Sequence, residues 1–304
     1  MIRTAILGAG TKEAGELIRI LVNHPDTEVV CLADPLLAGR KAADIHHGLI
    51  GDTDMAFTAE ADVDSADVIF LCADSDMARA IRRLPVLPDS PRIIDMCGGK
   101  LSGYEGEGFV PAVSELFRKP LVRGARRAMV IHPALSLATV ALGPLASGML
   151  LAGSLRLRLS MPEDILRAFD KESFAGDLDL LLSGFQKSWC GSIETETESS
   201  SRERGMLLDA EMTTSVPVQE IAGIYESIYD DHNFSFLKPG EPLPEDAEGT
   251  QKVIIHPSQL QGGIRIQAVA DARLRGGAGD AVHAMNLLFA LHEKTALSLK
   301  ASSF

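Results

Sequence analysis

Apolar runs and amphipathic segments alternate through the first 131 residues. The apolar runs lie at residues 3–8, 28–33, 67–72, 92–96 and 128–131. Residues 13–22, between the first two runs, have the spacing of one apolar helix face, which is formed by Ala14, Leu17, Ile18 and Leu21. Strands that are apolar throughout, with helices between them, predict an α/β fold with a parallel, doubly wound sheet.

The pattern changes after about residue 131. Within residues 154–160, positions 155–159 alternate between leucine and arginine, and residues 206–212 and 263–270 also have strand character. They predict a second, mostly antiparallel sheet. Two further helices are expected at residues 217–229 and about 279–291. The polar residues 193–204 form either a mobile loop or an exposed edge strand.

Composition narrows the class of protein. The chain has 304 residues, of which 46% are hydrophobic and 23% charged, so it is long enough for two domains. A net charge of −13 disfavours a general nucleic-acid surface. No apolar run is long enough to span a membrane, and the first strand begins almost at Met1, so a cytoplasmic protein is expected.

The cysteines and histidines show no metal-binding spacing. No C-x-x-C pair occurs, and Cys31 and Cys72 lie in apolar runs, which predicts buried thiols in a reducing compartment. Among the eight histidines, the adjacent His46 and His47 would point in different directions on a helix. We therefore expect no metal site.

A glycine-bearing turn joins the first strand to the first helix. Gly8 and Gly10 permit a tight turn that brings backbone N–H groups close to a pyrophosphate, and Gly15 lets the helix pack close to the strand. The spacing departs from G-x-G-x-x-G, and a glycine turn that only packs would look similar. The turn predicts a Rossmann-type nucleotide-binding domain.

The end of the chain shows a family resemblance. Residues 271–291 read DARLRGGAGDAVHAMNLLFAL, and they resemble the pattern D-N-L-x-K-G-A-A-G-Q-A-x-x-N-M-N-L-M of the N-acetyl-γ-glutamyl-phosphate reductases of arginine biosynthesis. The glycine turn agrees with the same family, as do residues 15–17, 23–25, 38–41 and 217–237. The resemblance covers most of the chain. It implies a Rossmann domain of residues 1–131 and 285–304, and an α+β domain of residues 132–284.

The resemblance also implies an activity, which is the NADPH-dependent reduction of an acyl phosphate to a semialdehyde. In the family, a cysteine thiolate in N-P-G-C attacks the acyl phosphate, and a histidine moves protons. Here the matching segment runs from His132 to Leu137 and places Leu135 at the nucleophile position. The segment for the acid/base histidine falls near residues 175–177, which contain no histidine. The chain therefore lacks both groups of the standard thioester mechanism.

Three residues are candidates for the missing chemistry, each with a structural alternative. Ser136 is a candidate nucleophile or a packed or capping hydroxyl. Cys97 follows a strand, so it is either a relocated thiol or a small residue near the cofactor. His132 replaces the family asparagine and either contacts the substrate or caps the turn before Pro133.

The cofactor site is better preserved than the catalytic site. Asp34, at the end of the second strand, is placed to bind a ribose hydroxyl and to repel a 2′-phosphate, whereas Arg40 and Lys41 would attract one. Three alternatives therefore stay open: the cofactor is NADP, it is NAD, or binding has been lost. The residues expected to bind it are Gly8, Gly10, Thr11, Ala14, Asp34, Gly276, Gly279 and Asn286.

The predicted substrate is a small acyl phosphate or a related metabolite. Arg204 matches a family arginine before a strand and is either a ligand for the carboxylate or phosphate of this substrate or an ordinary surface arginine. The resemblance implies a homodimer or homotetramer. Three functions stay open: a reductase with a displaced nucleophile, a reductase without covalent catalysis, and a non-catalytic paralogue that binds nucleotide, metabolite or a partner subunit.

Overall fold

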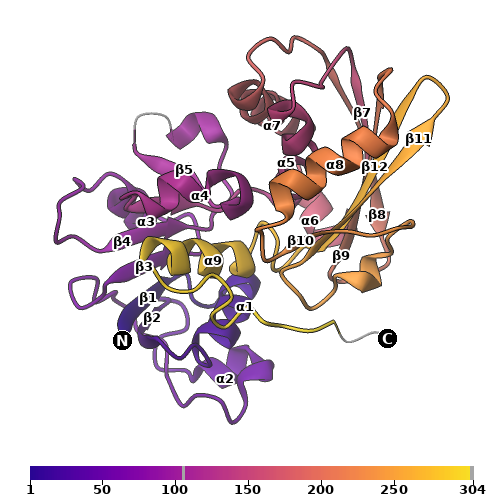
Figure 1. Cartoon of the computed structure of the whole chain (residues 1–304). Coiled ribbons are helices and arrows are strands. Elements are labelled where there is room, and N and C mark those ends of the chain that lie inside the picture. The colour runs from indigo at the N-terminus through magenta and orange to yellow at the C-terminus, as the bar shows by residue number, and fades with distance from the viewer. Residues whose placement is uncertain (105–106, 302–304) are drawn as a thin grey trace. The chain divides into compact units, whose positions relative to one another are not determined.

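The computed structural model describes residues 1–104 and 107–301, which form two units. One unit comprises Met1–Ile131 and Gly277–Ser298, and the other comprises His132–Gly276 and the described residues after Ser298. The predicted return to the first unit at residue 285 lies too late. The last helix, α9 (Ala278–Leu288), is continuous and packs on α1 (Lys12–Leu21) and α4 (Ser114–Val122), so all of it belongs to the first unit (Figure 1).

The first unit is built on a parallel six-stranded sheet, as predicted. Its order is β2-β1-β3-β4-β6-β5. The strands are β1 (Ile2–Leu7), β2 (Thr27–Ala33), β3 (Val68–Leu71), β4 (Arg92–Asp95), β5 (Phe109–Pro111) and β6 (Arg127–Met129). Only β5 was not predicted, because a strand of three residues leaves no periodic signal.

The strand order reverses at β1. Strand β2 lies on one side of β1 and β3 on the other, and Cys72 N donates a 2.8 Å hydrogen bond to Leu7 O where β1 and β3 end. Ligands of such sheets bind at the carboxyl ends of the strands at this reversal. The topology therefore directs attention to the turn after β1.

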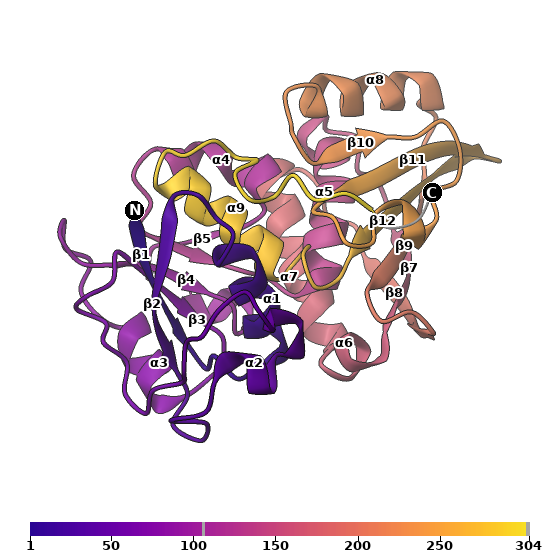
Figure 2. The ribbon, with the colours of Figure 1, turned by 90° about the horizontal axis from the view of Figure 1, so that it is seen from below.

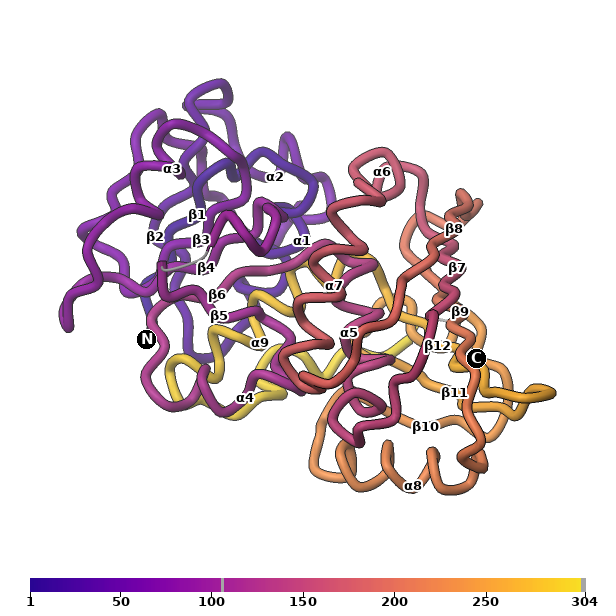
Figure 3. Tube along the Cα trace, turned by 90° about the horizontal axis from the view of Figure 1, so that it is seen from above, coloured from indigo at the N-terminus to yellow at the C-terminus, as the bar shows by residue number. Residues whose placement is uncertain are grey.

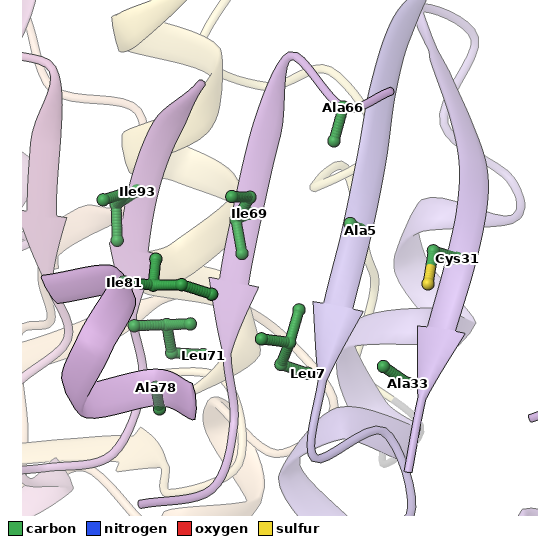
Figure 4. Close-up of a cluster of buried hydrophobic side chains, with 10 residues drawn as sticks. All are labelled: Ala5, Leu7, Cys31, Ala33, Ala66, Ile69, Leu71, Ala78, Ile81 and Ile93. Carbon is green, nitrogen blue, oxygen red and sulfur yellow. The ribbon is translucent and has the colours of Figure 1, made fainter. Parts of the chain in front are cut away.

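Helices cover the two faces of this sheet. Helix α9 packs on β4 and β6 and lies beside α1 and α4 (Figure 2). The other face carries the cluster drawn in Figure 4, in which strand residues such as Leu7, Leu71 and Ile93 face Ala78 and Ile81 of α3 (Asp76–Arg82). Burial on both faces explains why the strands are apolar throughout.

Helix α1 follows from its sequence. Its predicted apolar face is buried, and the side chain of Thr11 caps its first turn. The short α2 (Ala42–Ile45) follows β2. Cys31 and Cys72 are buried free thiols, as predicted.

The second unit contains a mixed six-stranded sheet in the order β10-β11-β12-β9-β7-β8. Its three central pairings are antiparallel and the two outer ones parallel, which confirms the mostly antiparallel prediction. The strands are β7 (Leu155–Pro162), β8 (Ile193–Ser200), β9 (Gly205–Thr213), β10 (Ser235–Leu237), β11 (Val253–Leu260) and β12 (Gly263–Asp271). The polar segment with two predicted alternatives is the exposed edge strand β8.

The helices of this unit pack around α5 (Pro133–Ser147), of which every residue except the last is buried. Helix α7 (Lys171–Phe185) lies beside α5, as Figure 3 also shows, and α8 (Val218–Tyr229) packs on it as well. The short α6 (Glu163–Arg167) follows β7. No helix of the described residues is long and apolar enough to cross a membrane.

A proline inside α5 is compensated by a tyrosine of α8. Pro144 has no N–H, so it cannot donate to the carbonyl of Val140 four residues earlier. The Tyr229 hydroxyl donates to that carbonyl over 2.6 Å. Tyr225 donates to the carbonyl of Ala141. That carbonyl can also accept the ordinary helical hydrogen bond from the amide of Leu145, four residues later.

Replacing Tyr229 with Phe is expected to lower the free energy of unfolding of the second unit by about 1–3 kcal/mol, because it leaves a buried carbonyl without a donor. Tyr225→Phe is the matched control and should cost less, since the carbonyl of Ala141 keeps a helical partner. Urea unfolding followed by the fluorescence of Trp189, the single tryptophan, measures both. Equal losses would contradict this account of Pro144.

Candidate functional site

The turn after β1 has the backbone conformation that its glycines predict. Gly8 has a φ of +72°, and its N–H donates to Ala33 O over 2.9 Å. A Cβ atom at Gly8 would lie 2.4 Å from the Cβ of Ala73, which follows β3. Only glycine therefore fits where the ends of β1 and β3 approach each other.

The side chain of Asp34 binds the backbone of the turn. It follows β2, and its Oδ2 accepts a hydrogen bond of 3.1 Å from the N–H of Gly10. Its Oδ1 accepts another of 3.1 Å from Leu36 N. A carboxylate has about four acceptor positions, so two bonds leave capacity for ribose hydroxyls. A Cβ atom at Gly10 would lie 2.7 Å from Oδ2, which explains the second glycine.

Thr11 and Ala14 complete the start of α1. The Thr11 hydroxyl donates to Gly8 O over 3.1 Å and accepts from Ala14 N over 3.2 Å, so it ties the turn to the helix. The expectation that Gly15 lets α1 pack on the strand is corrected. A Cβ atom at Gly15 would lie 2.5 Å from Nδ1 of His46, whose Nε2 lies 2.8 Å from the carbonyl oxygen of Ala9.

The two basic residues after β2 differ in their surroundings. Lys41 lies 3.0 Å from the carboxylate of Asp54, and this pairing raises the pKa of Lys41. Arg40 is exposed. Asp34, which accepts a hydrogen bond from Gly10, places a negative charge at the turn.

Cys97 lies at the end of β4 beside a buried carboxylate. Asp95 is fully buried and accepts from Arg82, from the Tyr104 hydroxyl over 2.9 Å and from Cys97 N over 2.9 Å. The Cys97 thiol donates to Leu71 O over 3.4 Å. Burial, followed by the Asp95 carboxylate, raises the pKa of Cys97 to about 12, so at neutral pH it is a thiol and a poor nucleophile.

The start of α5 holds the family's nucleophile position. Leu135 is 3% exposed and Ser136 fully buried in the first turn of the helix. His132 caps the helix, because its Nδ1 accepts from Ala134 N over 3.2 Å. Its Nε2 faces the carbonyl oxygen of Ile165 at 3.4 Å, and burial lowers the pKa of His132 to about 4. His132 is therefore neutral at physiological pH.

Residues 175–177, where the family histidine is expected, lie in the middle of α7. They supply no imidazole to the site.

Arg204 lies before β9 and binds a buried carboxylate. Its Nε donates to Asp271 over 2.6 Å, and Asp271 also accepts from Gly249 N over 2.7 Å and from Arg273 N over 2.8 Å. Arg273, two residues after Asp271, is buried and donates through Nη2 to Asp164. Sequence reasoning missed Arg273, although an arginine at the leucine position of the family pattern D-N-L-x-K-G was a visible signal.

The last cofactor candidates fall in different places. Gly276 has a φ of +65° and Gly279 lies buried in the first turn of α9. Asn286 lies near the other end of that helix, where its Oδ1 accepts from His24 over 3.0 Å and its Nδ2 donates to the carbonyls of Glu293 and Thr295. His24 follows α1, a helix about 15 Å long that starts at the glycine turn. The structure therefore does not bring Asn286 to that turn.

The structure groups the remaining candidates within each unit. Gly8, Gly10, Thr11, Ala14 and Asp34 form one turn. The start of α5 and the short helix α6 meet through His132 and Ile165. The roles of these residues toward cofactor and substrate stay predictions.

Comparison with known proteins agrees with the geometry of the turn. Residues 3–98 match the family model "Semialdehyde dehydrogenase, NAD binding domain". Among solved structures, the fold is similar to aspartate semialdehyde dehydrogenase II of Vibrio cholerae, with a TM-score of 0.68 over 95% of this chain and 98% of that one at 13% identity. The enzyme of Candida albicans, solved with NADP, gives 0.69 over 95% and 99% at 12% identity.

Full-length relatives identify the family. The N-acetyl-gamma-glutamyl-phosphate reductase of Parabacteroides distasonis is 31% identical, and that of Bacteroides thetaiotaomicron is 28% identical, each over the whole of both chains. Identity of this extent, together with the glycine turn and the two-unit fold, places the chain among the N-acetyl-gamma-glutamyl-phosphate reductases, and it belongs to that family.

Proposed function

We propose that this protein is a nicotinamide-dependent reductase that acts on the acyl phosphate of an N-acylated glutamate, a step of arginine biosynthesis. The observation that carries the proposal is the β1–α1 turn, in which Gly8 has a positive φ and Asp34 holds Gly10. The names of the full-length relatives support the choice of substrate.

The turn residues fit a dinucleotide. The backbone of residues 8–11 and the start of α1 would hold the pyrophosphate, because the N-terminus of a helix attracts anions. Asp34 would accept hydrogen bonds from the adenosine ribose. The bound nicotinamide supplies hydride to an electrophilic carbonyl carbon.

Asp34 also favours NAD(H) over NADP(H), because its carboxylate would repel a 2′-phosphate. Asp34→Ser is expected to raise the affinity for NADPH relative to NADH about tenfold, since it removes this like-charge repulsion. Calorimetric titration of nucleotide-free protein with both cofactors measures the ratio. Asp44→Ser, which removes an exposed carboxylate on α2, is the control and should leave the ratio unchanged. An unchanged ratio in Asp34→Ser would argue against ribose recognition by Asp34.

The proposed reaction proceeds without a covalent enzyme intermediate. Leu135 has no nucleophilic atom, Ser136 is fully buried, and the Cys97 thiol is protonated at neutral pH. An acyl phosphate is already an activated carbonyl with phosphate as its leaving group, so neither a thioester nor proton donation to the leaving group is required. The task of the chain is then to bind and orient the substrate.

The second unit supplies the proposed substrate contacts. Arg204 offers a guanidinium near the start of β9, anchored through Nε by Asp271. His132 is neutral and carries its proton on Nε2, because Nδ1 accepts from the backbone. Its Nε2–H faces the carbonyl oxygen of Ile165 at 3.4 Å, and it would donate to a carbonyl oxygen of the substrate in exchange for that contact.

A non-catalytic paralogue is the second candidate function. It is favoured by Leu135, because the nucleophile position of the family lies within an apolar, buried helix. Such a protein would bind the nucleotide or the metabolite without turning it over.

One experiment separates the two. Nucleotide-free protein is titrated with NADH and NADPH by calorimetry, and the same sample is assayed for acyl-phosphate reduction through the loss of nicotinamide absorbance. Binding with turnover supports the reductase. Binding without turnover supports the non-catalytic paralogue, and the absence of binding would overturn both nucleotide-dependent roles.

A further inference from the structure

Arg273 is a buried cation whose hydrogen bonds are incomplete. It follows β12 and is only 6% exposed. Its Nη2 lies 2.6 Å from Oδ1 and 2.5 Å from Oδ2 of Asp164, and 3.2 Å from the carbonyl oxygen of Glu203. The Nε and Nη1 atoms are buried and have no hydrogen-bond partner among the described residues.

This arrangement leaves a large part of the guanidinium unsatisfied. An arginine carries five N–H donors, of which three are on Nε and Nη1. Buried donors without an acceptor are rare in native proteins and costly, above all on a charged group. Nε and Nη1 carry the adjacent guanidinium donors that an oxyanion can bind together, whereas Asp164 and the Glu203 carbonyl contact only Nη2.

The partner of Arg273 is able to leave. The side chain of Asp164 is 45% exposed and lies in the first turn of the short helix α6, so its carboxylate can be hydrated when it turns away. Asp271, the partner of Arg204, is fully buried and has no such route to water. Asp164 is thus the exchangeable anion of the two.

The Arg273–Asp164 pair also lies next to the start of α5. Asp164 Oδ1 accepts from the N–H of Ile165 over 3.0 Å, and the carbonyl of Ile165 faces Nε2 of His132. His132 caps the helix whose first turn contains Leu135, the family's nucleophile position. Arg273 is therefore close to where the proposed function places the substrate.

We propose that Arg273 recognises an oxyanion of the ligand, a carboxylate or a phosphate, through Nε and Nη1, and that Asp164, which binds the neighbouring Nη2, moves away when the ligand binds. This inference deepens the proposed function, on which its choice of ligand rests. The ligand anion takes up the guanidinium donors, and the Asp164 carboxylate moves into water. Since the family pattern has leucine at this position, the contact distinguishes this chain from that pattern.

The test measures anion binding by the full chain without nucleotide. Native protein, Asp164→Asn and Glu163→Gln are titrated by calorimetry with inorganic phosphate and, separately, with glutarate, at constant ionic strength. Both substitutions remove one carboxylate from the same turn of α6, but Glu163 pairs with Arg167 and not with Arg273. Asp164→Asn is expected to bind at least one of the two anions about tenfold more tightly than native protein. Glu163→Gln should stay within about twofold of native protein.

A second substitution locates the effect. Arg273→Leu, made in the Asp164→Asn background, should abolish the gain in affinity. If that variant does not fold, the comparison of Asp164→Asn with Glu163→Gln still tests whether Asp164 competes with the anion, because both variants keep Arg273.

The two anions identify the ligand group. A gain for phosphate alone assigns the site to the phosphoryl group, and a gain for glutarate assigns it to a carboxylate. Equal affinities in Asp164→Asn and Glu163→Gln would overturn the proposal. The anion titrations contain no nucleotide and measure no turnover, so a negative result in them does not contradict the proposed reductase activity. A failure of dinucleotide binding would be seen only in the titration with NADH and NADPH.

Discussion

Replacing Arg82 with Met is expected to lower the free energy of unfolding of the first unit by about 3–5 kcal/mol. Arg82 ends α3 and pairs with Asp95, which is fully buried at the end of β4. Without the guanidinium, Asp95 keeps only the Tyr104 hydroxyl and the Cys97 amide as donors in the described structure. A buried carboxylate without its cation must lose hydration that these two donors do not replace.

Arg79→Met is the matched control, because Arg79 lies one turn earlier on the same helix. It binds Asp74 and Asp76, and its side chain is 46% exposed. Removing this exposed ion pair should cost much less than removing the buried one, because solvent screens it. Urea unfolding followed by circular dichroism compares the two variants. Similar losses would mean that the Arg82–Asp95 pair contributes no more than a surface contact.

Gly8→Ala is expected to destabilise the first unit by at least about 3 kcal/mol and to abolish dinucleotide binding. Two costs combine at this position. The backbone has a φ of +72°, which a residue with a Cβ atom rarely adopts, and the new methyl carbon would lie 2.8 Å from the backbone nitrogen of Ala73. Because β1 and β3 are hydrogen-bonded neighbours, the turn must move instead.

Gly108→Ala separates these two costs. Gly108 has a φ of +73°, and a Cβ atom there meets nothing within 4 Å. This variant should therefore lose only about 1–2 kcal/mol and bind NADH as native protein does. Thermal unfolding and calorimetric titration measure both properties. If Gly8→Ala matched Gly108→Ala in both, the close approach to Ala73 would have no energetic consequence.

In the first unit, the strands that the sequence predicts are those with a sustained apolar pattern. Five strands of this kind have both faces covered, and they are β1, β2, β3, β4 and β6. A strand covered on both faces needs apolar residues throughout, so its sequence shows an uninterrupted apolar run. The strands β5 and β10 have only three residues each, which is too short for an apolar pattern to be recognised. β11 was also not predicted, and Pro257 within it weakens its strand character.

In the candidate site, too, local features could be predicted from the sequence and features that depend on distant residues could not. The glycine turn is a local feature, because residues 8–14 carry most of its geometry, and it could be predicted from the sequence. Arg273 was visible only as an arginine at the leucine position of the family pattern. Its burial and its pairing with Asp164, 109 positions earlier, could not be predicted from the sequence. The neutral state of His132 likewise depends on burial by elements distant in sequence. In the sequence alone, a buried charged residue cannot be distinguished from an exposed one, because the residue that pairs with it is distant along the chain.

The division of the first unit into two segments has a consequence for synthesis. Residues 132–276 of the second unit are made between Ile131 and Gly277, at about 5–20 residues per second. Roughly 7–30 s therefore pass before α9 follows the strands that it covers. During that time the faces of β4 and β6 under α9 remain open to water or to a chaperone, while the second unit has nearly all of its residues. The nucleotide-binding unit, whose strands are made first, therefore receives its last helix only after nearly all of the second unit has been made.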